Sequence, residues 1–477
     1  MKRKIMIGLG LCISLFLSGC GVSAPTDESA ISMRQSATST ISAPESASPE
    51  QSAVTFSPVG TSPGISPAEN EDTDASPPSP SVAEGRITAA NLYHEDAFFS
   101  GRVASFSKEN PSYGIEYQAL YQEDDAERAL LEIATGNGPD VLYLDRRDID
   151  ALQANGALGD LGSLLSRDTA DALLPGAVQM GTYDGNLLAI PLSVDIRTLL
   201  TSRDYWPVDT WTVEDVLSAS QGKAQPQGLF LDMGGTDSYF YNLYFIVGIN
   251  IGDSPFIKDG KCGFDCQEFR DILEMIKART GQAVNNSTPQ DRLAPLTEGS
   301  YMGVECVISN MSHFCRVYEK LGDSANLVGY PSDAGKTYYL SDNGMLAVNQ
   351  NAMEKEGVKE LVNYLLSLEA QQYLPYRLSV RLDMPESQLT YDQAMQTYNW
   401  QSPNYTGFQL PAKEDGGSYL EEYLDFLENA APLAVSSDDI FNMVYEEADS
   451  YFQSDKDLDA VIDTIQRRVQ LYLDERN

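Results

Sequence analysis

Histidine and positive charge are both scarce in this chain. Its 477 residues include two histidines, His94 and His313, and 32 Lys and Arg residues against 70 Asp and Glu residues, which gives a formal net charge of -38. So acidic a chain repels nucleic acid, and no basic cluster after Lys4 could neutralise a run of phosphates. The Gly-x-Ser-x-Gly, His-Glu-x-x-His and Walker motifs are absent as well. We therefore expect no enzyme, no cofactor and no binding of nucleic acid.

Cysteine is also rare, with six residues in the chain. Cys12 and Cys20 lie in or directly after an apolar run at the N-terminus. The other four are Cys262, Cys266, Cys306 and Cys315. Their Cys-x3-Cys and Cys-x8-Cys spacings differ from the Cys-x2-Cys pairs of zinc sites, so no metal site is expected. We expect structural cysteines, either free or joined in one or two disulfides, whose pairing the sequence does not give.

Only the N-terminus has a long apolar run. Lys2, Arg3 and Lys4 precede uncharged and mostly apolar residues 5–17, and Leu17-Ser18-Gly19-Cys20 follows. A spanning helix needs roughly twenty apolar residues, so this shorter run predicts a signal peptide over 1–19 that ends in a lipobox. Cys20 would then carry acyl chains such as palmitate and anchor the chain to the outer face of the cytoplasmic membrane. An ordinary N-terminal transmembrane anchor is the alternative.

Residues 20–85 are predicted to form a tether. The stretch 22–85 has fifteen Ser and nine Pro but only one aromatic residue, Phe56, and one basic residue, Arg34. Too little apolar surface is available there to offset the entropy of ordering the chain, so we expect disorder. As a coil the stretch would have an end-to-end distance of about 45 Å.

Strand and helix signals alternate from Arg86 onward, over a length that suits two domains rather than one core. The pattern predicts strands at residues 87–93, 115–120 and 140–144. The intervening segments have apolar residues three or four apart and predict helices: Phe99, Val103 and Phe106 in the first, and Ala126, Leu130, Ile133 and Ala134 in the second. Strands separated by helices predict an α/β fold with parallel pairing, in which ligands bind at the carboxyl ends of strands.

Three later helices have clear signals. Thr212 and Asp215 have the spacing of a capping box at a helix start. A leucine stripe predicts a second helix, with Leu361, Leu365 and Leu368 on one face. The third ends the chain and carries Leu458, Ile462, Ile465, Val469 and Tyr472. Each stripe is expected to face a core.

A series of segments resembles the extracellular solute-binding proteins of ABC importers, in the group of family 1 that includes sugar-binding members of the maltose-binding type. The matching segments are 132–145 (EIATGNGPDVLYLD), 154–161 (ANGALGDL), 183–191 (YDGNLLAIP), 210–216 (TWTVEDV), 328–331 (VGYP) and 444–448 (VYEEA). Each segment alone is weakly specific, but their order and spacing over 86–477 make the resemblance specific.

The resemblance implies a two-lobed α/β fold of the type II periplasmic-binding-protein kind, with hinge strands between the lobes and a ligand cleft between them. Lobe one would hold 86–193 and 343–385, and lobe two 197–338 and 390–477. The chain would cross between lobes at 191–197, at 338–344 and again after Arg381. Members often have Pro-Val-Arg near the third crossing, where this chain has Ser379-Val380-Arg381.

The resemblance also implies which residues line the cleft. Those at strand ends and at the first crossing are His94, Glu95, Asp145, Arg146, Ser193 and Asp195. Those expected across the cleft are Tyr239, Tyr241, Glu305, Trp400 and Phe441. Carboxylates accept hydrogen bonds from sugar hydroxyls, and flat rings stack on the apolar face of a pyranose. The alternative for each aromatic residue is packing in the core.

These expectations combine into a membrane-anchored, monomeric receptor that captures a small solute, preferably a mono- or oligosaccharide, and delivers it to an ABC permease. Three alternatives remain open. One is a different solute, such as a polyamine, a peptide or a metal complex, and another is a sensory lipoprotein that acts upstream of a kinase. The third is a secreted glycoside-active enzyme, because a pair of carboxylates that flanks a cleft could perform acid/base chemistry.

Overall fold

The computed structural model describes eleven stretches of the chain. They are residues 86–94, 96–207, 210–221, 226–283, 285, 287, 291–332, 338–374, 377–383, 419–433 and 436–476. All of them belong to one compact unit, Pro77–Asn477. The predicted signal peptide, Cys20 and the tether lie outside the described residues, as do Glu95 and Trp400. In the part of the chain that is described, no helix is long and apolar enough to cross a membrane.

The first lobe is built on a five-stranded sheet with the order β2-β1-β3-β14-β6. Its parallel part consists of β1 (Ile87–Asn91), β2 (Ile115–Ala119) and β3 (Val141–Leu144), which confirms the predicted pairing. The other two strands, β14 (Met345–Val348) and β6 (Ala189–Pro191), run antiparallel to their neighbours. Every residue of β3 is buried, as expected of a strand that is covered on both faces.

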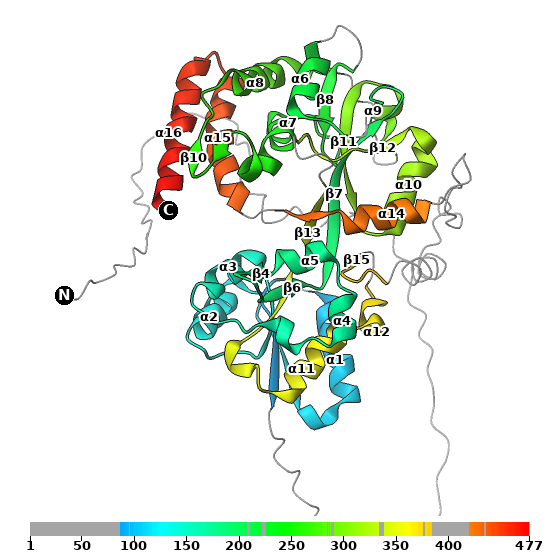
Figure 1. Cartoon of the computed structure of the whole chain (residues 1–477), viewed down its shortest axis with the longest axis vertical. Helices are drawn as coiled ribbons and strands as arrows, with labels where there is room; N and C mark the ends of the chain where they lie inside the picture. Colours follow the sequence, from blue (N-terminus) through cyan, green and yellow to red (C-terminus); the bar gives the residue numbers. More distant parts are fainter. Residues whose placement is uncertain are drawn as a thin grey trace, which may run out of the picture. The chain divides into compact units, whose positions relative to one another are not determined.

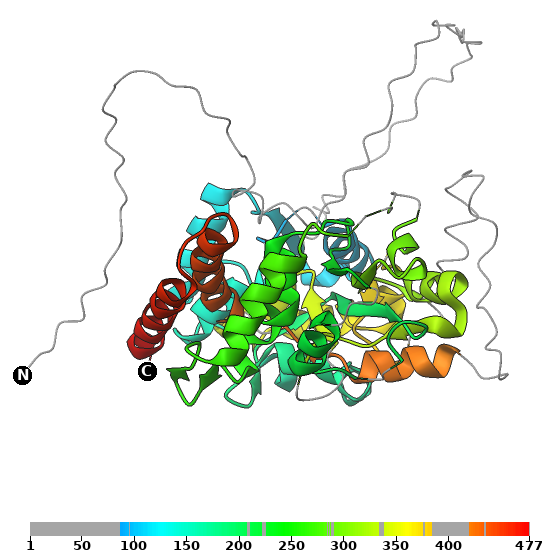
Figure 2. The same ribbon diagram turned by 90° about the horizontal axis from the view of Figure 1, so that it is seen from above.

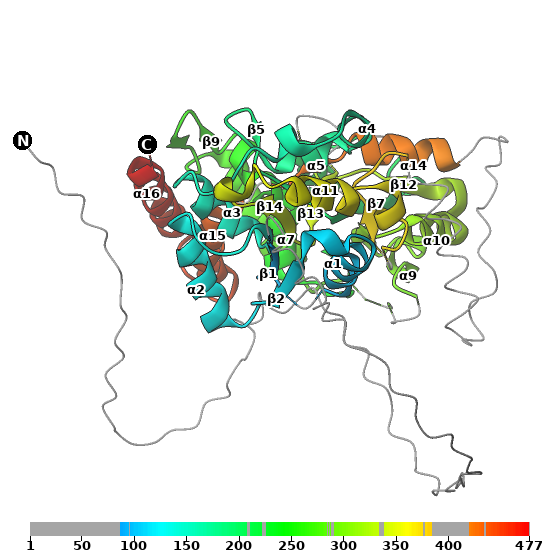
Figure 3. The same ribbon diagram turned by 90° about the horizontal axis from the view of Figure 1, so that it is seen from below.

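Helices and one hairpin surround this sheet (Figure 1). They are α1 (Ala97–Glu109), α2 (Glu123–Ala134), α3 (Arg146–Gln153), α4 (Arg167–Asp171), α5 (Pro175–Met180), the hairpin of β4 (Thr182–Tyr183) and β5 (Asn186–Leu187), α11 (Glu356–Leu365) and α12 (Leu368–Gln371). Phe99, Val103 and Phe106 are buried on α1 as predicted, and α1 lies beside α11 (Figure 3). The predicted leucine stripe is wrong at Leu368, because Ser367 caps a new helix there and Leu368 is 45% exposed.

The second lobe is built on a seven-stranded sheet. Its main order is β16 (Ala431–Pro432), β13 (Tyr339–Asp342), β7 (Ser193–Ser202), β11 (Tyr301–Ile308) and β8 (Gly228–Leu231). Two short strands pair with the ends of β7: β15 (Leu378–Ser379) with its start and β12 (Ala325–Leu327) with its end. A single long strand therefore organises the whole sheet, and Figure 1 shows it running between the two sheets.

Two groups of helices cover the two faces of this second sheet. One core contains residues of α6 (Val213–Gln221), α7 (Tyr239–Ile246), α8 (Gln267–Arg279), α15 (Ser436–Phe452), α16 (Leu458–Arg476) and the hairpin of β9 (Ile257–Lys258) and β10 (Lys261–Cys262). The other core contains residues of α9 (Ala294–Thr297), α10 (Met311–Leu321) and α14 (Tyr419–Glu428), and it continues into the first lobe. In Figure 2 the C-terminal helices α15 and α16 lie side by side, in dark orange and red.

Two predicted local signals of the second lobe are confirmed. At the start of α6, the backbone amide of Thr212 donates to Asp215 Oδ2 at 2.8 Å, and the amide of Asp215 donates to Thr212 Oγ1 at 3.1 Å. This reciprocal pair is a capping box. On α16, the residues Ile462, Ile465 and Val469 are fully buried, so the last helix faces the core as its periodicity predicts.

The two-residue segment that connects β13 to β14 makes a tight turn at Gly344. This glycine has a φ of 104°, and a Cβ atom there would lie 2.5 Å from Cζ of Tyr143. A residue with a side chain would be strained and would also collide with the Tyr143 ring. The chain therefore passes from the second sheet to the first over a single glycine, in contact with the end of β3.

Candidate ligand-binding site

The carboxyl ends of two parallel strands of the first lobe place polar side chains at one edge of the sheet. Tyr93 and His94 follow β1, and their rings lie 4.1 Å apart. Asp145 follows β3 and caps α3, because its Oδ1 accepts a hydrogen bond from the Arg147 backbone amide at 2.9 Å. Arg146 is the first residue of that helix. Parallel strands bring these four side chains to one edge, which is where α/β sheets bind ligands.

The strands that cross between the lobes add further polar groups. In the sheet register, Asp195 of β7 is opposite Ser341 of β13. The Asn343 side-chain amide donates to Asp195 Oδ2 at 3.4 Å, and the Asn343 backbone amide donates to the carbonyl of Ser193 at 3.3 Å. Tyr143 on β3 donates its hydroxyl to the Asn343 carbonyl. The buried Ser193 thus supports the crossing through its backbone, while Asp195 presents a carboxylate.

Electrostatic coupling links several of these groups to one hydroxyl. The pKa of Tyr93 is raised well above its usual value, first by burial and then by Asp342, Asp145 and Asp195, while Arg377 acts in the opposite direction. Carboxylates disfavour the phenolate by like-charge repulsion. The structure therefore brings Asp145 and Asp195, from opposite sheets, together beside Tyr93, and adds Asp342.

Burial also raises the pKa values of two of these carboxyl groups. For Asp195, burial is opposed by hydrogen bonds from Ser309 and Asn343 and by the charges of Arg377 and Arg197. For Asp342, burial is opposed by the Gly344 amide, which donates at 3.2 Å, and by Arg146. Removal from water destabilises the charged form of each carboxyl group, and the neighbouring donors and cations do not fully offset this effect.

Three of the predicted site residues keep a buried polar atom that has no hydrogen-bond partner among the described residues. The atoms are His94 Nδ1, Arg146 Nε and Asp195 Oδ1. Arg146 does use another nitrogen, since its Nη1 donates to the Leu433 carbonyl at 2.5 Å. Native proteins leave few buried polar atoms unpaired, and each one calls for a physical explanation. These three atoms are open to hydrogen bonds from outside the described residues.

The second lobe contributes a buried ion pair. Glu305 on β11 accepts hydrogen bonds from Arg197 Nε at 3.1 Å and Nη2 at 2.5 Å, and its side chain is 1% exposed. The Tyr330 hydroxyl donates to Glu305 Oε1 at 3.3 Å, and the Met233 amide donates to Oε2 at 3.4 Å. Although burial works against the charge of Arg197, the nearby Glu305 raises its pKa. Glu305 is therefore fully engaged within the protein.

Tyr241 lies next to this ion pair. Burial raises its pKa, and the carboxylates of Asp232 and Glu305 raise it further. The side chain is only partly buried, and Met233, in the turn after β8, is 46% exposed beside it. This corner of the second lobe thus offers an accessible aromatic ring and an accessible apolar side chain.

Two predicted site residues, Tyr239 and Phe441, pack on other aromatic rings and not on the polar groups of the candidate site. The ring of Tyr239 stacks on Phe452 with centroids 4.8 Å apart. Phe441 is 2% exposed and packs among Phe240, Tyr244 and Tyr445 in the core of the second lobe. Both residues occupy the core-packing positions that were the alternative for aromatic residues. Glu95 and Trp400 lie outside the described residues.

Four residues that the structure links to the candidate site were missed by sequence reasoning. They are Tyr93, Arg197, Asp342 and Arg377. Tyr93 directly precedes His94 and could have been included with it. The other three depend on strand register and on pairs far apart in sequence, such as Arg197 with Glu305, for which the chain carries no local signal.

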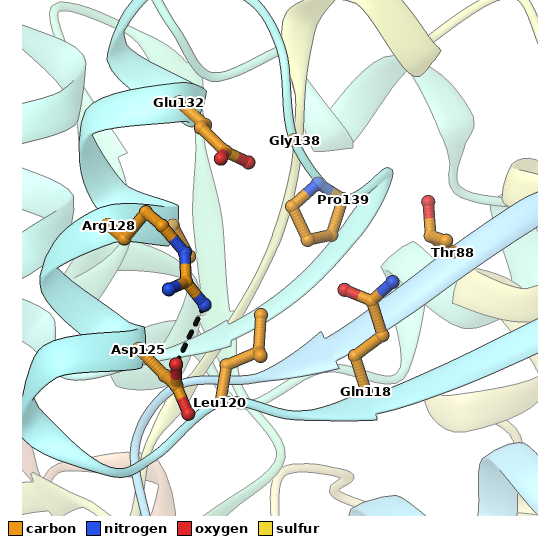
Figure 4. A pocket seen from close by; sticks show the side chains of 9 residues that line it. Thr88, Gln118, Leu120, Asp125, Arg128, Glu132, Gly138 and Pro139 are labelled. Atoms are coloured by element: carbon orange, nitrogen blue, oxygen red, sulfur yellow. Dashed lines mark hydrogen bonds and ion pairs between the residues drawn. The ribbon is translucent and has the colours of Figure 1, made fainter.

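A separate groove lies on the first lobe between α2 and the edge strand β2 (Figure 4). It encloses about 340 Å³, and Arg128 forms an ion pair with Asp125 across one wall at 2.7 Å. Thr88, Gln118 and Pro139 line the opposite side. None of the unpartnered buried atoms found in the described chain belongs to this groove, so its polar groups do not indicate a missing ligand.

The described residues contain no group of three His, Cys, Asp or Glu side chains that could hold a metal ion. Cys262, Cys266, Cys306 and Cys315 are all free thiols, which selects one of the two states expected for them. The site is thus made of carboxylates, guanidinium groups, imidazole and tyrosine.

Sequence comparison identifies one protein family. A family model described as bacterial extracellular solute-binding protein matches residues 101–396. No curated protein sequence matches the chain.

Solved structures with a similar fold have low sequence identity to this chain. The sugar-binding protein MalE from Xanthomonas citri has a TM-score of 0.52 and 17% identity, over 82% of this chain and 98% of that one. An extracellular solute-binding protein of family 1 from Alicyclobacillus acidocaldarius has a TM-score of 0.52 and 14% identity, with 82% and 99% covered. The cyclic alpha-maltosyl-1,6-maltose binding protein from Arthrobacter globiformis has a TM-score of 0.50 and 14% identity, with 81% and 98% covered. At these identities the likeness establishes a shared fold.

Proposed function

This chain belongs to the bacterial extracellular solute-binding proteins, and from that membership we propose that it captures a mono- or oligosaccharide between its two lobes and delivers it to the permease of an ABC transporter. The single observation that carries the proposal is the set of unpartnered buried atoms on His94, Arg146 and Asp195. A bound solute with several hydroxyl groups would satisfy all three, because a hydroxyl both donates and accepts hydrogen bonds.

The chemistry of the site supports a polar solute with flat apolar faces. Asp145 and Asp195 are acceptors for hydroxyl groups, and Arg146 is a donor. The exposed Met233 and the half-buried ring of Tyr241 provide apolar surface on the second lobe, on which the C–H face of a sugar ring can stack. The fold is shared with sugar-binding proteins, which makes a saccharide the favoured solute among those considered.

We divide the chain accordingly. Lobe one comprises 86–193 and 343–385, and lobe two comprises 197–338 and 390–477, with the crossing strands as the hinge; β15, which pairs with the start of β7 in the second sheet, belongs to these crossing strands. The described site groups come from both sheets and from the crossings, so a solute that bridges them would favour one arrangement of the lobes. A permease could then distinguish the loaded receptor from the empty one.

The proposal includes a location and a route. Cleavage after Gly19 and acylation of Cys20 would hold the protein at the outer face of the cytoplasmic membrane, with residues 20–85 as a tether. From there the receptor, as a monomer, would exchange solute with the permease, while a separate ATPase chain would supply energy. The support for anchoring is the N-terminal sequence pattern.

A ligand screen by thermal unfolding tests the proposal. A solute that binds only the folded state stabilises it by about 2.7 kcal/mol at one hundred times its Kd. Saccharides, amino acids, peptides and polyamines would be added in turn to the full chain, and at least one saccharide series is expected to raise the Tm. The Asp195→Ala variant should keep its fold and lose that response. A rise with peptides or amino acids alone would overturn the saccharide assignment.

A further inference from the structure

Of the guanidinium groups that the described residues place near the crossing, Arg377 and Arg197 are already paired with carboxylates. Arg377 Nη1 lies 3.1 Å from Asp96 Oδ2, whose side chain is 5% exposed. Arg197 forms two hydrogen bonds to Glu305. Each pair is close to electrically neutral and buried on its acidic side, so neither arginine supplies an uncompensated positive charge to a ligand site.

The remaining charges of the described site are predominantly negative. Asp145, Asp195 and Asp342 all act on the Tyr93 hydroxyl, as the shift of its pKa shows. The cation left to balance them is Arg146, and one of its nitrogens is occupied by the neutral Leu433 carbonyl. In the described site, three carboxylates therefore influence the partly buried Tyr93, and Arg146 is the one guanidinium there that is not paired with a carboxylate.

Asp195 has no ion-pair partner of its own among the described residues. Its Oδ1 is buried and has no hydrogen-bond partner in the described part of the chain, and its Oδ2 receives a long 3.4 Å bond from Asn343. The Ser309 hydroxyl is a neutral donor, and Arg377 and Arg197 act on Asp195 only while paired elsewhere. A buried carboxylate without its own cation is costly, and a cationic donor relieves that cost better than a neutral hydroxyl does.

We propose that the solute carries a protonated amino group and that Asp195 binds it, so that the preferred saccharide is an amino sugar rather than a neutral sugar. This inference rests on the proposed function, and it assigns Asp195 the part that determines specificity. His94 and Arg146 then serve the hydroxyl groups of the same solute, because their unpartnered nitrogens lie on the first lobe, on the other side of the crossing from β7.

Matched ligands test the charge directly on the unaltered full chain. Glucosamine and galactosamine carry the amino group, their N-acetyl derivatives mask it, and glucose and galactose lack it. By calorimetry we expect one hexosamine to bind about tenfold or more tightly than both of its neutral counterparts, since a charge-assisted hydrogen bond adds roughly that factor. The preference should shrink in high salt.

An isosteric variant tests the residue. Asp195→Asn keeps the shape of the side chain and removes its charge, so the ratio of hexosamine affinity to neutral-sugar affinity should fall to about threefold or less, whatever the change in the affinity for neutral sugars. Asp463→Asn is the matched control, because Asp463 is exposed on α16 and its loss should leave every affinity unchanged. The ligand comparison on the unaltered chain stands even if the Asp195→Asn variant does not fold.

The outcomes separate this inference from the function on which it rests. Equal binding of glucose and glucosamine, or tighter binding of the neutral sugars, would contradict the proposal that the solute carries an amino group. It would leave the proposed function as a saccharide receptor unchanged. If putrescine or spermidine binds and no saccharide does, recognition of an amino group would be supported and the assignment of the solute as a saccharide would be contradicted. A preference for hexosamines that Asp195→Asn leaves intact would overturn the role of Asp195.

Discussion

Arg197 and Glu305, which are 108 residues apart in sequence, are joined by two hydrogen bonds from one guanidinium to a single carboxylate oxygen. They lie on adjacent antiparallel strands but are not directly opposite each other, because Arg197 pairs with Val307, two residues beyond Glu305. The pair therefore ties the middle of β7 to the middle of β11, next to Tyr241 and Met233.

Removal of one member of this pair should destabilise the protein strongly. Glu305→Gln leaves the Arg197 charge partly buried without its partner, and loss of one partner of a buried pair costs about 3 kcal/mol or more. The measurement is urea unfolding followed by circular dichroism. The double variant Arg197→Met with Glu305→Leu should recover most of the loss, and a fully stable Glu305→Gln protein would contradict a structural role for the pair.

Stability should depend on pH through His313. Burial, and then the charge of Arg316, lower the pKa of this histidine to about 4, whereas in the unfolded chain it is about 6.5. Between these values the unfolded state binds the proton more readily, so the free energy of unfolding falls as the pH is lowered from about 6.5 to about 4. The expected loss from this residue is about 3 kcal/mol. His313→Gln should flatten the dependence in this window, and an unchanged slope would show that other groups cause it.

Two glutamines of α16 should protect the thiol of Cys262. Gln466 accepts a hydrogen bond from the Phe264 amide at 2.8 Å and donates to the Cys262 carbonyl at 2.6 Å, and Gln470 accepts from the Cys262 amide at 3.0 Å. Gln466→Ala removes two of these bonds and should cost about 1 to 3 kcal/mol. Alkylation of Cys262 by iodoacetamide should become faster. Gln453→Ala, at the end of α15, is the control and should leave the labelling rate unchanged.

Gly344 should not tolerate a side chain. Gly344→Ala places a methyl group against the Tyr143 ring at a φ of 104°, so both strain and collision oppose it, and we expect a loss of about 2 kcal/mol or more in the free energy of unfolding. Gly156→Ala is a matched control, because Gly156 also has a positive φ, of 64°, but nothing lies within 4 Å of the added atom. Equal losses in the two variants would show that the collision with Tyr143 contributes nothing.

Local features of the fold could be predicted from the sequence. The capping box of Thr212 and Asp215 and the buried face of α1 depend on residues three or four apart, which a single helix brings together. The error at Leu368 has a local cause as well, since a serine that caps a new helix interrupts an apolar periodicity that would otherwise continue.

The site could be predicted only in part. His94, Asp145 and Asp195 follow or begin strands, and strand ends meet at one edge of a sheet. Arg197 and Asp342 depend on register between strands that are distant in sequence, which no local pattern encodes. Phe441 was assigned to the cleft although it packs in the core, because a residue type that suits both environments does not reveal which one it occupies.

The position of β14 has a consequence for how the protein is made. Met345–Val348 lies between β3 and β6, in the interior of the first sheet, although the other strands of that sheet all come from residues before 192. A chain emerging from the ribosome or from an export channel therefore leaves the facing sides of β3 and β6 unpaired until this short strand arrives. Open edges pair readily with other chains. Export in an unfolded state, followed by folding of the complete chain, would avoid that exposure.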